Sequence, residues 1–461
     1  MENLKELELK TTLLKLKKIL EINAFVSICL LCAAPLIGLF IYYPQAGGSA
    51  DLAIVDAKSY FVKIIGWYCL VSGLISVVVN SILYGFRNIL ISNLKNPWNI
   101  LFLVTILFSI ISIFRVPFDK TSNALNGVYF IREGFLAYLA YWGIYLAASS
   151  LKKTKYKMWA IRALIFSSAF LGICVLVDKY LGIPGLICHT GRGEAITGTY
   201  INRNHYGYYL CLASIVSLAC FIYAKNNKWR VIYGFVYAIN IFILNKINSL
   251  GPLLAFLVGM ILFIIFTFVR KEKQYYMILG TTAFITIALI AAINRRQLYV
   301  ELPATFKDLF TLMKSVFGGA EQAGDSSYAV ASGRNHLWVD ALTLIKEQPI
   351  FGHGIGREID LYTIRFGYSD AAHNEYLSLA IAIGIPGAIC FLIGNLYILI
   401  FSIVNVKDLP KNMMIAALGV GTYFISSMFG VSLPTVEFAF FMVLGMLNSH
   451  YNENYQKLEI N

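Results

Sequence analysis

The chain has 461 residues, of which 58% are hydrophobic and only 14% are charged, with a formal net charge of +13. Soluble domains carry about 25% charged residues and do not hide many apolar runs of about 20 residues, the length that crosses about 30 Å of hydrocarbon. The composition therefore excludes an ordinary soluble protein. Because the apolar runs are continuous, it also excludes a β-barrel with alternating strands. We predict an all-α polytopic membrane protein.

The positive charge is explained by topology. Most of the excess lies in short loops between the apolar runs, as the positive-inside rule predicts, so no nucleic-acid partner is expected. All cysteines except Cys188 fall inside apolar runs, so no disulfide framework is expected. Cys29 and Cys32 have no histidine or carboxylate near them in the sequence that would complete a metal site.

The first 20 residues mix glutamate and lysine, and we expect a cytosolic amphipathic helix and no cleavable signal peptide. Twelve spans follow in a single transmembrane domain, residues 1–461. They are predicted at 22–43, 61–84, 97–116, 128–150, 158–178, 205–224, 230–245, 249–269, 275–293, 374–404, 412–429 and 434–449. Basic clusters such as KKTKYK (152–157) fall on one side, with Arg295-Arg296 as the exception, so both termini are predicted to be cytoplasmic.

Three outward segments are longer than simple turns: 44–60, 179–204 and 294–373. The last lies between spans nine and ten and is long enough to contain short helices of its own. One amphipathic helix is predicted from apolar residues at helical spacing, with Ser332 as its N-cap and Pro349 as its stop. The apolar residues are Leu337, Ala341, Leu344 and Ile345.

Histidine and arginine gather on the outward side of this topology. The residues are His189, His205, His336, His353 and His373, with Arg192, Arg203, Arg334, Arg357 and Arg365. An anionic ligand on that side would explain the arginines, because the guanidinium fork matches phosphate. Contact with lipid headgroups is the competing explanation.

His373 begins predicted span ten, where a histidine can act as a base near neutral pH or serve only as a cap. Asn374 and Glu375 make this boundary more polar. The sequence Gly384-Ile385-Pro386-Gly387 then interrupts the same span. Either other parts of the protein, or a cavity, satisfy the freed backbone groups, or the break is a packing kink.

The segment GTYINRNHYGYYL (198–210) begins span six and combines tyrosines with amide, guanidinium and imidazole groups. Tyrosines alone would form an interfacial belt, whereas the combination also suits sugar rings and their hydroxyls. In predicted span four, Arg132 and Glu133 are expected to form an internal ion pair.

Three segments in order, GTYINRNHYGYYL, SGRNHLWVDALTLIKEQPIFGHGIG and HNEYLSLAIAIGIPG, carry a resemblance to a known family. Together with the twelve-span frame and the large loop before the histidine span, they resemble the O-antigen ligase and O-antigen polymerase family of bacterial envelope proteins. The resemblance covers residues 198–447.

The resemblance implies a metal-independent glycosyltransferase without a cofactor, with a GT-C-like fold in the bacterial inner membrane. Its active site would face the periplasm or the cell exterior. Such proteins take glycan from an undecaprenyl-diphosphate carrier and transfer it to an acceptor glycan or glycolipid. The acceptor is another lipid-linked repeat unit in a polymerase and lipid A-core in a ligase. Membrane lipid and a chain-length regulator are the further partners implied.

By the same resemblance, His373 matches the histidine that activates the acceptor hydroxyl, and Arg334 matches the loop arginine that binds the diphosphate. Arg203 and Asn204 match the polar start of the equivalent span. The other residues expected to bind substrate are His205, Asn374, Glu375, Arg357 and Lys246.

The chain departs from the ligase pattern at Asn248-Ser249-Leu250-Gly251, where Leu250 replaces an expected second diphosphate arginine. Lys246 or Arg203 would substitute, and the loss favours a polymerase. A flippase or transporter fits twelve spans equally well, but we find no two similar halves. A protein O-oligosaccharyltransferase ranks third, because no large soluble segment follows span twelve. Neither a GxxxxGK loop nor a convincing outward acidic pair indicates a nucleotide or a metal.

Overall fold

The computed structural model describes residues 2–40, 49–94, 96–128, 131–181, 196–200, 202–307 and 334–458. These ranges contain helices, turns and irregular segments and no strand. The helices are α1 (Glu2–Leu31), η1 (Ala34–Phe40), α2 (Ser49–Tyr84), α3 (Phe86–Leu94), α4 (Pro97–Ile113), η2 (Phe118–Lys120), α5 (Thr121–Asn126), α6 (Phe135–Ser150), α7 (Thr154–Leu181), α8 (Arg203–Tyr223), α9 (Asn227–Ile247), α10 (Leu250–Val269), η3 (Lys273–Tyr275), α11 (Tyr276–Ile293), η4 (Gln297–Glu301), α13 (Arg334–Glu347), α14 (Glu358–Phe366), α15 (Glu375–Val404), α16 (Lys411–Ser427) and α17 (Pro434–Leu458).

Seven helices in the described ranges are long and apolar enough to cross a membrane, in α2, α7, α8, α9, α10, α11 and α15. Two shorter apolar helices, Pro97–Ile113 and Pro434–Ser449, accompany them. The chain is thus an all-helical, multi-pass membrane protein. Each of the twelve predicted spans contains a helix, while the count of twelve crossings stays a prediction.

Several predicted spans begin or end differently in the structure. Span two was expected from residue 61, but α2 begins at Ser49, within the predicted outward segment 44–60. Span one was expected to continue to residue 43, but α1 ends at Leu31 and a 3-10 helix follows, since Pro35 cannot continue the α-helical ladder. Span four was expected from residue 128, but α6 begins at Phe135. Gly127 and Arg132 have positive φ angles of 84° and 57°, so the described residues just before α6 are not helical.

Asparagine begins several of the helices. As an N-cap, its side-chain oxygen accepts a hydrogen bond from a backbone N–H that the first turn leaves unpaired. Asn96, Asn202, Asn226 and Asn374 cap α4, α8, α9 and α15 in this way. The sequence thus fixes where these four helices start, including the one that begins just after His373.

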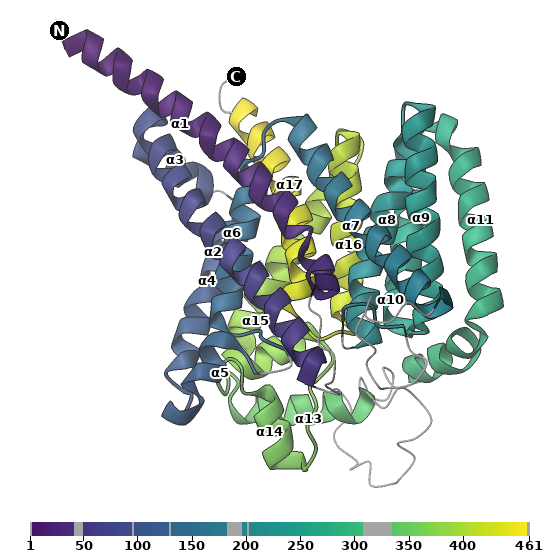
Figure 1. Ribbon diagram of the computed structural model, residues 1–461. Helices are drawn as coiled ribbons and strands as arrows, with labels where there is room; N and C mark the ends of the chain where they lie inside the picture. Colours follow the sequence, from purple (N-terminus) through teal and green to yellow (C-terminus); the bar gives the residue numbers. More distant parts are fainter. Residues whose placement is uncertain are drawn as a thin grey trace.

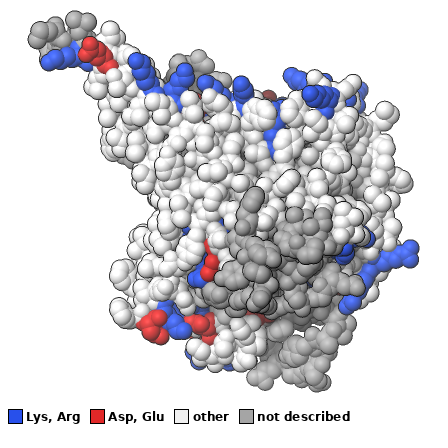
Figure 2. All heavy atoms as spheres, viewed as in Figure 1, with Lys and Arg blue, Asp and Glu red and all other residues white. Residues whose placement is uncertain are grey.

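Figure 1 shows a bundle in which α1 begins and α17 ends at the same end, with α13 and α14 at the opposite end. We call these the terminus end and the loop end. Figure 2 shows lysine and arginine along the terminus end, a broad uncharged band, and charges of both signs at the loop end. An uncharged band between two charged ends is the pattern of a membrane-spanning bundle.

The centre of the bundle is α8, of which nearly every residue is buried. It packs against α9, α16 and α10, while α15 packs against α4 and α17 against α6. By contrast, α11 lies at the edge and buries a single stripe at helical spacing, Leu279, Ala283, Thr286 and Ile290. The helices that begin near His373 and His205, α15 and α8, are therefore anchored in the bundle.

Candidate functional site

The loop end is fixed to the bundle at a break in α15. Gly384 has φ 84° and ψ 165°, so the helix is interrupted there. The segment after α13 supplies the missing partners: the N–H of His353 donates to Ile381 (2.8 Å), that of Gly354 to Ala382 (3.0 Å), and Ile385 donates to the carbonyl of Pro349 (2.8 Å). Of the two explanations offered for the Gly-Pro sequence, protein satisfying the freed backbone groups is the one observed.

At this break, the backbone of the segment after α13 lies so close to the backbone of α15 that there is no room for a side chain on Gly352 or Gly384. A Cβ on Gly384 would lie 2.1 Å from the carbonyl oxygen of Ile350, and one on Gly352 would lie 2.4 Å from that of Ala382. Both residues also have positive φ, where glycine is strongly favoured. The two glycines therefore let the segment between α13 and α14 lie directly on α15.

His373 lies just before α15 in a left-handed conformation with φ 49°. Its Nε2 is 2.9 Å from Oδ1 of Asp370, and the two side chains are 21% and 43% exposed. A carboxylate accepts, so Nε2 carries the hydrogen and Nδ1 is the nitrogen able to take up a proton. Burial would raise the pKa of Asp370, but the hydrogen bond from His373 and the charges of His373 and His336 hold it below its usual value.

Glu358, in the first turn of α14, contacts the residue that precedes this histidine. Its Oε1 accepts hydrogen bonds from the N–H of Ala372 (2.8 Å) and the hydroxyl of Ser378 (2.9 Å). Burial raises the pKa of Glu358, against the opposing effect of these two donors and of His373. Glu358 is not among the predicted site residues, because nothing in its local sequence distinguishes it from an ordinary glutamate at the start of a helix.

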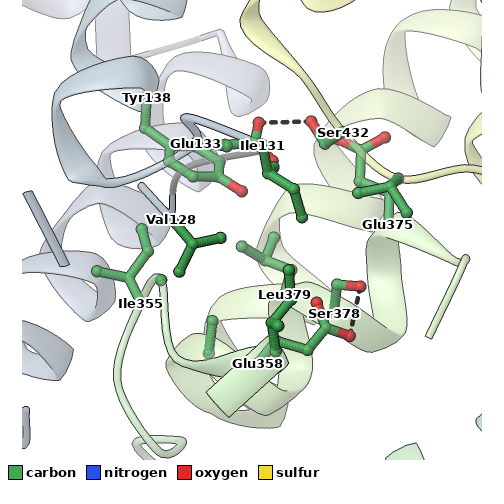
Figure 3. A pocket seen from close by; sticks show the side chains of 14 residues that line it. Val128, Ile131, Glu133, Tyr138, Ile355, Glu358, Glu375, Ser378, Leu379 and Ser432 are labelled. Atoms are coloured by element: carbon green, nitrogen blue, oxygen red, sulfur yellow. Dashed lines mark hydrogen bonds between the residues drawn. The ribbon is translucent and has the colours of Figure 1, made fainter. Parts of the chain in front are cut away.

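A cavity of about 50 Å³ opens beside Glu358, large enough for a few water molecules. Figure 3 shows Glu133, Glu358 and Glu375 around it, together with Ser378, Ser432 and Tyr138. Glu375 is only 5% exposed. None of the described residues that line the cavity is basic. Three carboxyl groups thus line one small cavity, and none of the described residues of its wall is a cation.

The expected ion pair between Arg132 and Glu133 is wrong. Arg132 instead forms a bidentate ion pair with Asp56 of α2. Its Nε donates to Oδ1 (2.6 Å) and its Nη2 donates to Oδ2 (2.7 Å). Glu133 accepts hydrogen bonds from the hydroxyls of Tyr141 (2.8 Å) and Ser432. The left-handed backbone at Arg132 accompanies this separation of two adjacent residues into different partners.

Two buried lysines of α2, Lys58 and Lys63, were not predicted as part of the site. Lys58 donates to the carbonyl (2.9 Å) and hydroxyl (3.1 Å) of Thr199, and its Nζ lies 3.4 Å from the ring centroid of Tyr200. Lys63 donates to the carbonyls of Asn126 and Arg132. Charged residues at the start of a long apolar helix were the available signal, since such residues usually face the bundle interior.

The polar start of α8 lies close to His373. His205 is within electrostatic range of both His373 and Lys58. The neighbouring Asn204 accepts a hydrogen bond from Ser249 (2.6 Å), which links α8 to the start of α10. The structure thus brings His205 into the region of His373, Asn374 and Glu375.

The predicted cations have different surroundings. Arg203 is exposed in the first turn of α8, and Lys246 is exposed at the end of α9, 5.6 Å from the ring centroid of Phe242. Arg357 directly precedes α14, and its Nε makes no hydrogen bond among the described residues. Arg365 is paired with Glu347 at 3.0 Å.

Other predicted residues have limited or no description. Arg334 begins α13, but its side chain lies outside the described part. His189, Arg192, Cys188 and Ser332 also lie outside it. In the ranges that the structure describes, no three His, Cys, Asp or Glu side chains are grouped closely enough to hold a metal ion.

Comparisons of the sequence with known proteins find a match that includes this region. A family model described as O-antigen ligase matches residues 234–392, which include His373, Glu358 and the break in α15. A Haemophilus influenzae protein described as uncharacterized is 26% identical over 217 residues, which are 43% of this chain and 50% of that protein. The chain thus spans about half the length of this relative. No solved structure matches.

Proposed function

We propose that the chain is a membrane glycosyltransferase that polymerises undecaprenyl-diphosphate-linked glycan repeat units, and the match of residues 234–392 to a family model described as O-antigen ligase supports this proposal. The observation that carries this proposal is the His373–Asp370 pair, which lies at the loop end within the matched region. The hydrogen bond fixes the tautomer, so Nδ1 is the base. Such a base typically contributes about a hundredfold to ten-thousandfold.

The reaction is a displacement at the anomeric carbon of the donor glycan. The acceptor hydroxyl gives its proton to Nδ1 of His373 as its oxygen forms the new glycosidic bond. The bond between the anomeric carbon and the diphosphate oxygen breaks, and undecaprenyl diphosphate leaves with the electron pair. The products are the extended glycan, the lipid diphosphate and a proton. No redox change and no further reactant is needed.

The leaving diphosphate requires fixed positive charge in a water-poor site. Arg334, Arg203 and Arg357 are the arginines that we assign to it, with Lys246 as a further cation. Arg365 is not included, because Glu347 already binds it. The Nε of Arg357 is buried and has no hydrogen-bond partner among the described residues, which leaves one donor for an anionic ligand.

We place the terminus end in the cytoplasm and the loop end outside the bacterial inner membrane, on a twelve-span, GT-C-like frame. The lysine and arginine residues gathered at the terminus end support this orientation. The acceptor is then another lipid-linked repeat unit, and a chain-length regulator is a partner. The second candidate is an O-antigen ligase, which the description of the matching family favours and Leu250, at the start of α10, disfavours.

The choice of acceptor is tested with purified protein and undecaprenyl-diphosphate repeat units alone, with products separated by size. A ladder of longer lipid-linked glycans is expected of a polymerase. Transfer that appears only after lipid A-core is added would replace this proposal with the ligase. Movement of the donor across a vesicle without any new glycosidic bond would replace both with a flippase.

A further inference from the structure

We propose that Glu358 is a positioning residue for the base: it fixes the turn that presents His373, and its negative charge stabilises the imidazolium that forms when His373 takes up a proton. This inference rests on the proposed function. Glu358 lies on α14, fifteen residues before His373, and nothing in the sequence motif that begins α15 includes it.

The backbone of His373 adopts a left-handed conformation. A positive φ of 49° is strained for any residue with a Cβ, so neighbouring contacts must hold it. On the following side, Asn374 caps α15 by accepting from the N–H groups of Tyr376 and Leu377. On the preceding side, the N–H of Ala372 donates to Glu358. Both neighbours of the histidine are therefore held by a side-chain oxygen.

Glu358 links α14 to the residues on both sides of His373. The oxygen that accepts from Ala372 also accepts from the hydroxyl of Ser378, in the first turn of α15. One carboxylate thus connects α14, the residue before His373, and the helix that begins after it. Loss of this oxygen would release all three, and the ring of His373 would no longer be held toward Asp370.

Glu358 also acts on His373 through its charge. A glutamine would accept the same two hydrogen bonds, so hydrogen bonding alone does not require a carboxylate. None of the described residues that line the adjoining cavity is basic, and Glu133 and Glu375 line it together with Glu358. Glu358 accepts the N–H of Ala372, the residue directly before His373, so the carboxylate lies within electrostatic range of the imidazole. The side chain of His373 is only 21% exposed, so solvent screens this charge only in part, and the charge favours the protonated form of the histidine.

Several other titratable groups surround His373, and they remain unchanged when Glu358 is substituted. They are Asp370 of the same loop, His205 of α8, Lys58 of α2 beyond His205, His336 of α13 beyond Asp370, and Glu375 of α15. None of them accepts a hydrogen bond from the Ala372 N–H, which belongs to Glu358. A substitution at Glu358 therefore tests a contact that these groups do not duplicate.

The decisive variant is Glu358→Gln, which keeps both hydrogen bonds and removes the charge. We expect kcat to fall about tenfold with KM unchanged, and the acidic limb of the pH profile to move to lower pH, because the imidazolium is less stable. Glu358→Ala removes the hydrogen bonds as well and should lose at least tenfold more. Asp360→Asn is the matched control, since Asp360 lies in the same helical turn but pairs with Lys120 at 3.5 Å.

A readout without turnover separates this inference from the proposed function. The titration of His373, followed by NMR of labelled histidine, should move to lower pH in Glu358→Gln and stay unchanged in Asp360→Asn. If the wild-type protein makes no glycan, the proposed function fails while this titration still tests Glu358. A wild-type titration curve in Glu358→Gln would overturn the inference, as would a wild-type rate and pH profile.

Discussion

The two ends of the bundle bury charge in different ways. At the terminus end, Arg270 donates to Glu272 (3.1 Å) and to three main-chain carbonyls, with side-chain exposures of 13% for Arg270 and 10% for Glu272. The carbonyls are those of Val406 (2.6 Å), Lys407 (3.1 Å) and Leu409 (2.7 Å). At the loop end, Glu133, Glu358 and Glu375 surround a cavity without a basic residue among the described residues of its wall.

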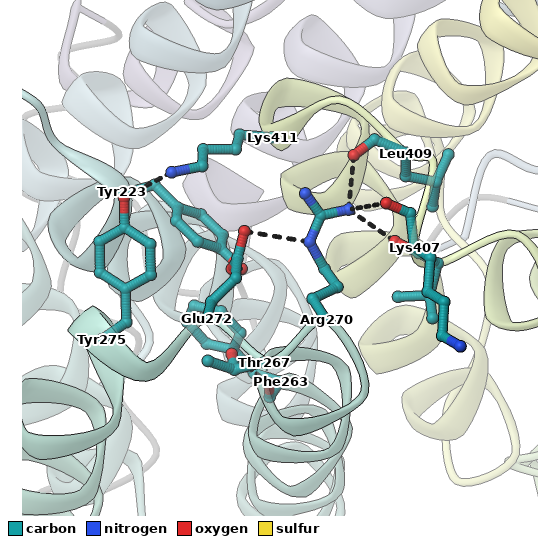
Figure 4. Close-up of polar contacts among 10 residues, drawn as sticks. Tyr223, Phe263, Thr267, Arg270, Glu272, Tyr275, Lys407, Leu409 and Lys411 are labelled. Atoms are coloured by element: carbon teal, nitrogen blue, oxygen red, sulfur yellow. Dashed lines mark hydrogen bonds and ion pairs between the residues drawn. The ribbon is translucent and has the colours of Figure 1, made fainter.

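The terminus-end group, which we call the Arg270 clamp, also includes Tyr223, Tyr275 and Lys411 (Figure 4). Tyr223 donates to Glu272 (2.9 Å), and Lys411 donates to Tyr275. The clamp joins the turn after α10 to the turn between α15 and α16. Its charges are matched by partners, as expected of a structural contact. At the loop end, none of the described residues that line the cavity pairs a cation with the three glutamates, as is typical of a site that binds or reacts.

The largest expected effect on stability is at the clamp. Arg270→Ala leaves Glu272 buried without its cation and three carbonyls without a donor, and it should lower the free energy of unfolding by about 3–5 kcal/mol. The measurement is thermal unfolding in detergent. Lys273→Ala, in the same turn but exposed, should be close to wild type. Equal stability of the two variants would contradict a structural role for the clamp.

The next effect is at the break in α15. Gly384→Ala brings a Cβ to 2.1 Å from the carbonyl of Ile350 and forces alanine into a positive φ. The expected cost is about 1–3 kcal/mol, with loss of activity because the segment before α14 is displaced. Gly280→Ala in α11 is the control, since no atom lies within 4 Å of the added Cβ. Thermal unfolding and transfer rates distinguish the two, and an active, stable Gly384→Ala protein would contradict the close packing described.

A smaller effect, with opposite signs at the two ends, is expected from glutamate-to-glutamine changes. Burial raises the pKa of Glu358 above the usual value for a glutamate, so the wild-type protein loses stability as the pH rises through the raised pKa. Glu358→Gln should therefore gain stability relative to wild type as the pH increases. Glu272→Gln breaks the clamp and should lose stability at neutral pH. Unfolding temperatures across a pH series test the contrast, and a parallel response of both variants would remove it.

The smallest effect is at Asp370, whose half-exposed bond to His373 is worth about 0–1 kcal/mol. The pKa of Asp370 lies below the usual value for an aspartate, because the hydrogen bond and charge of His373 outweigh burial. The stabilisation is therefore present above that value and is lost as the pH falls through the depressed pKa. Asp370→Asn should be slightly less stable than wild type at neutral pH and equal to it in strong acid. A difference that persists in strong acid would assign it to another cause.

Much of the fold was predictable, because continuous apolar runs leave few alternatives to membrane helices. The segments that carry His205, His373 and the break at Gly384 were also predictable, since their polar residues interrupt such runs. The partners of Arg132 and Glu133 were not, because Asp56 and Ser432 lie far away in the sequence. Glu358 was missed for the same reason: its importance comes from Ala372 and Ser378, which only the folded chain brings to it.

The most direct test of the account is the rate of glycosidic bond formation in His373→Ala, measured with undecaprenyl-diphosphate repeat units and, in parallel, with lipid A-core added. His353→Asn is the control. His353 is a second histidine of the loop end, and its ring contacts the main-chain carbonyl of Leu344 in α13. We predict a fall of about a hundredfold to ten-thousandfold for His373→Ala, with unchanged folding, and little change for the control. A fully active His373→Ala protein would contradict the assignment of His373 as the base.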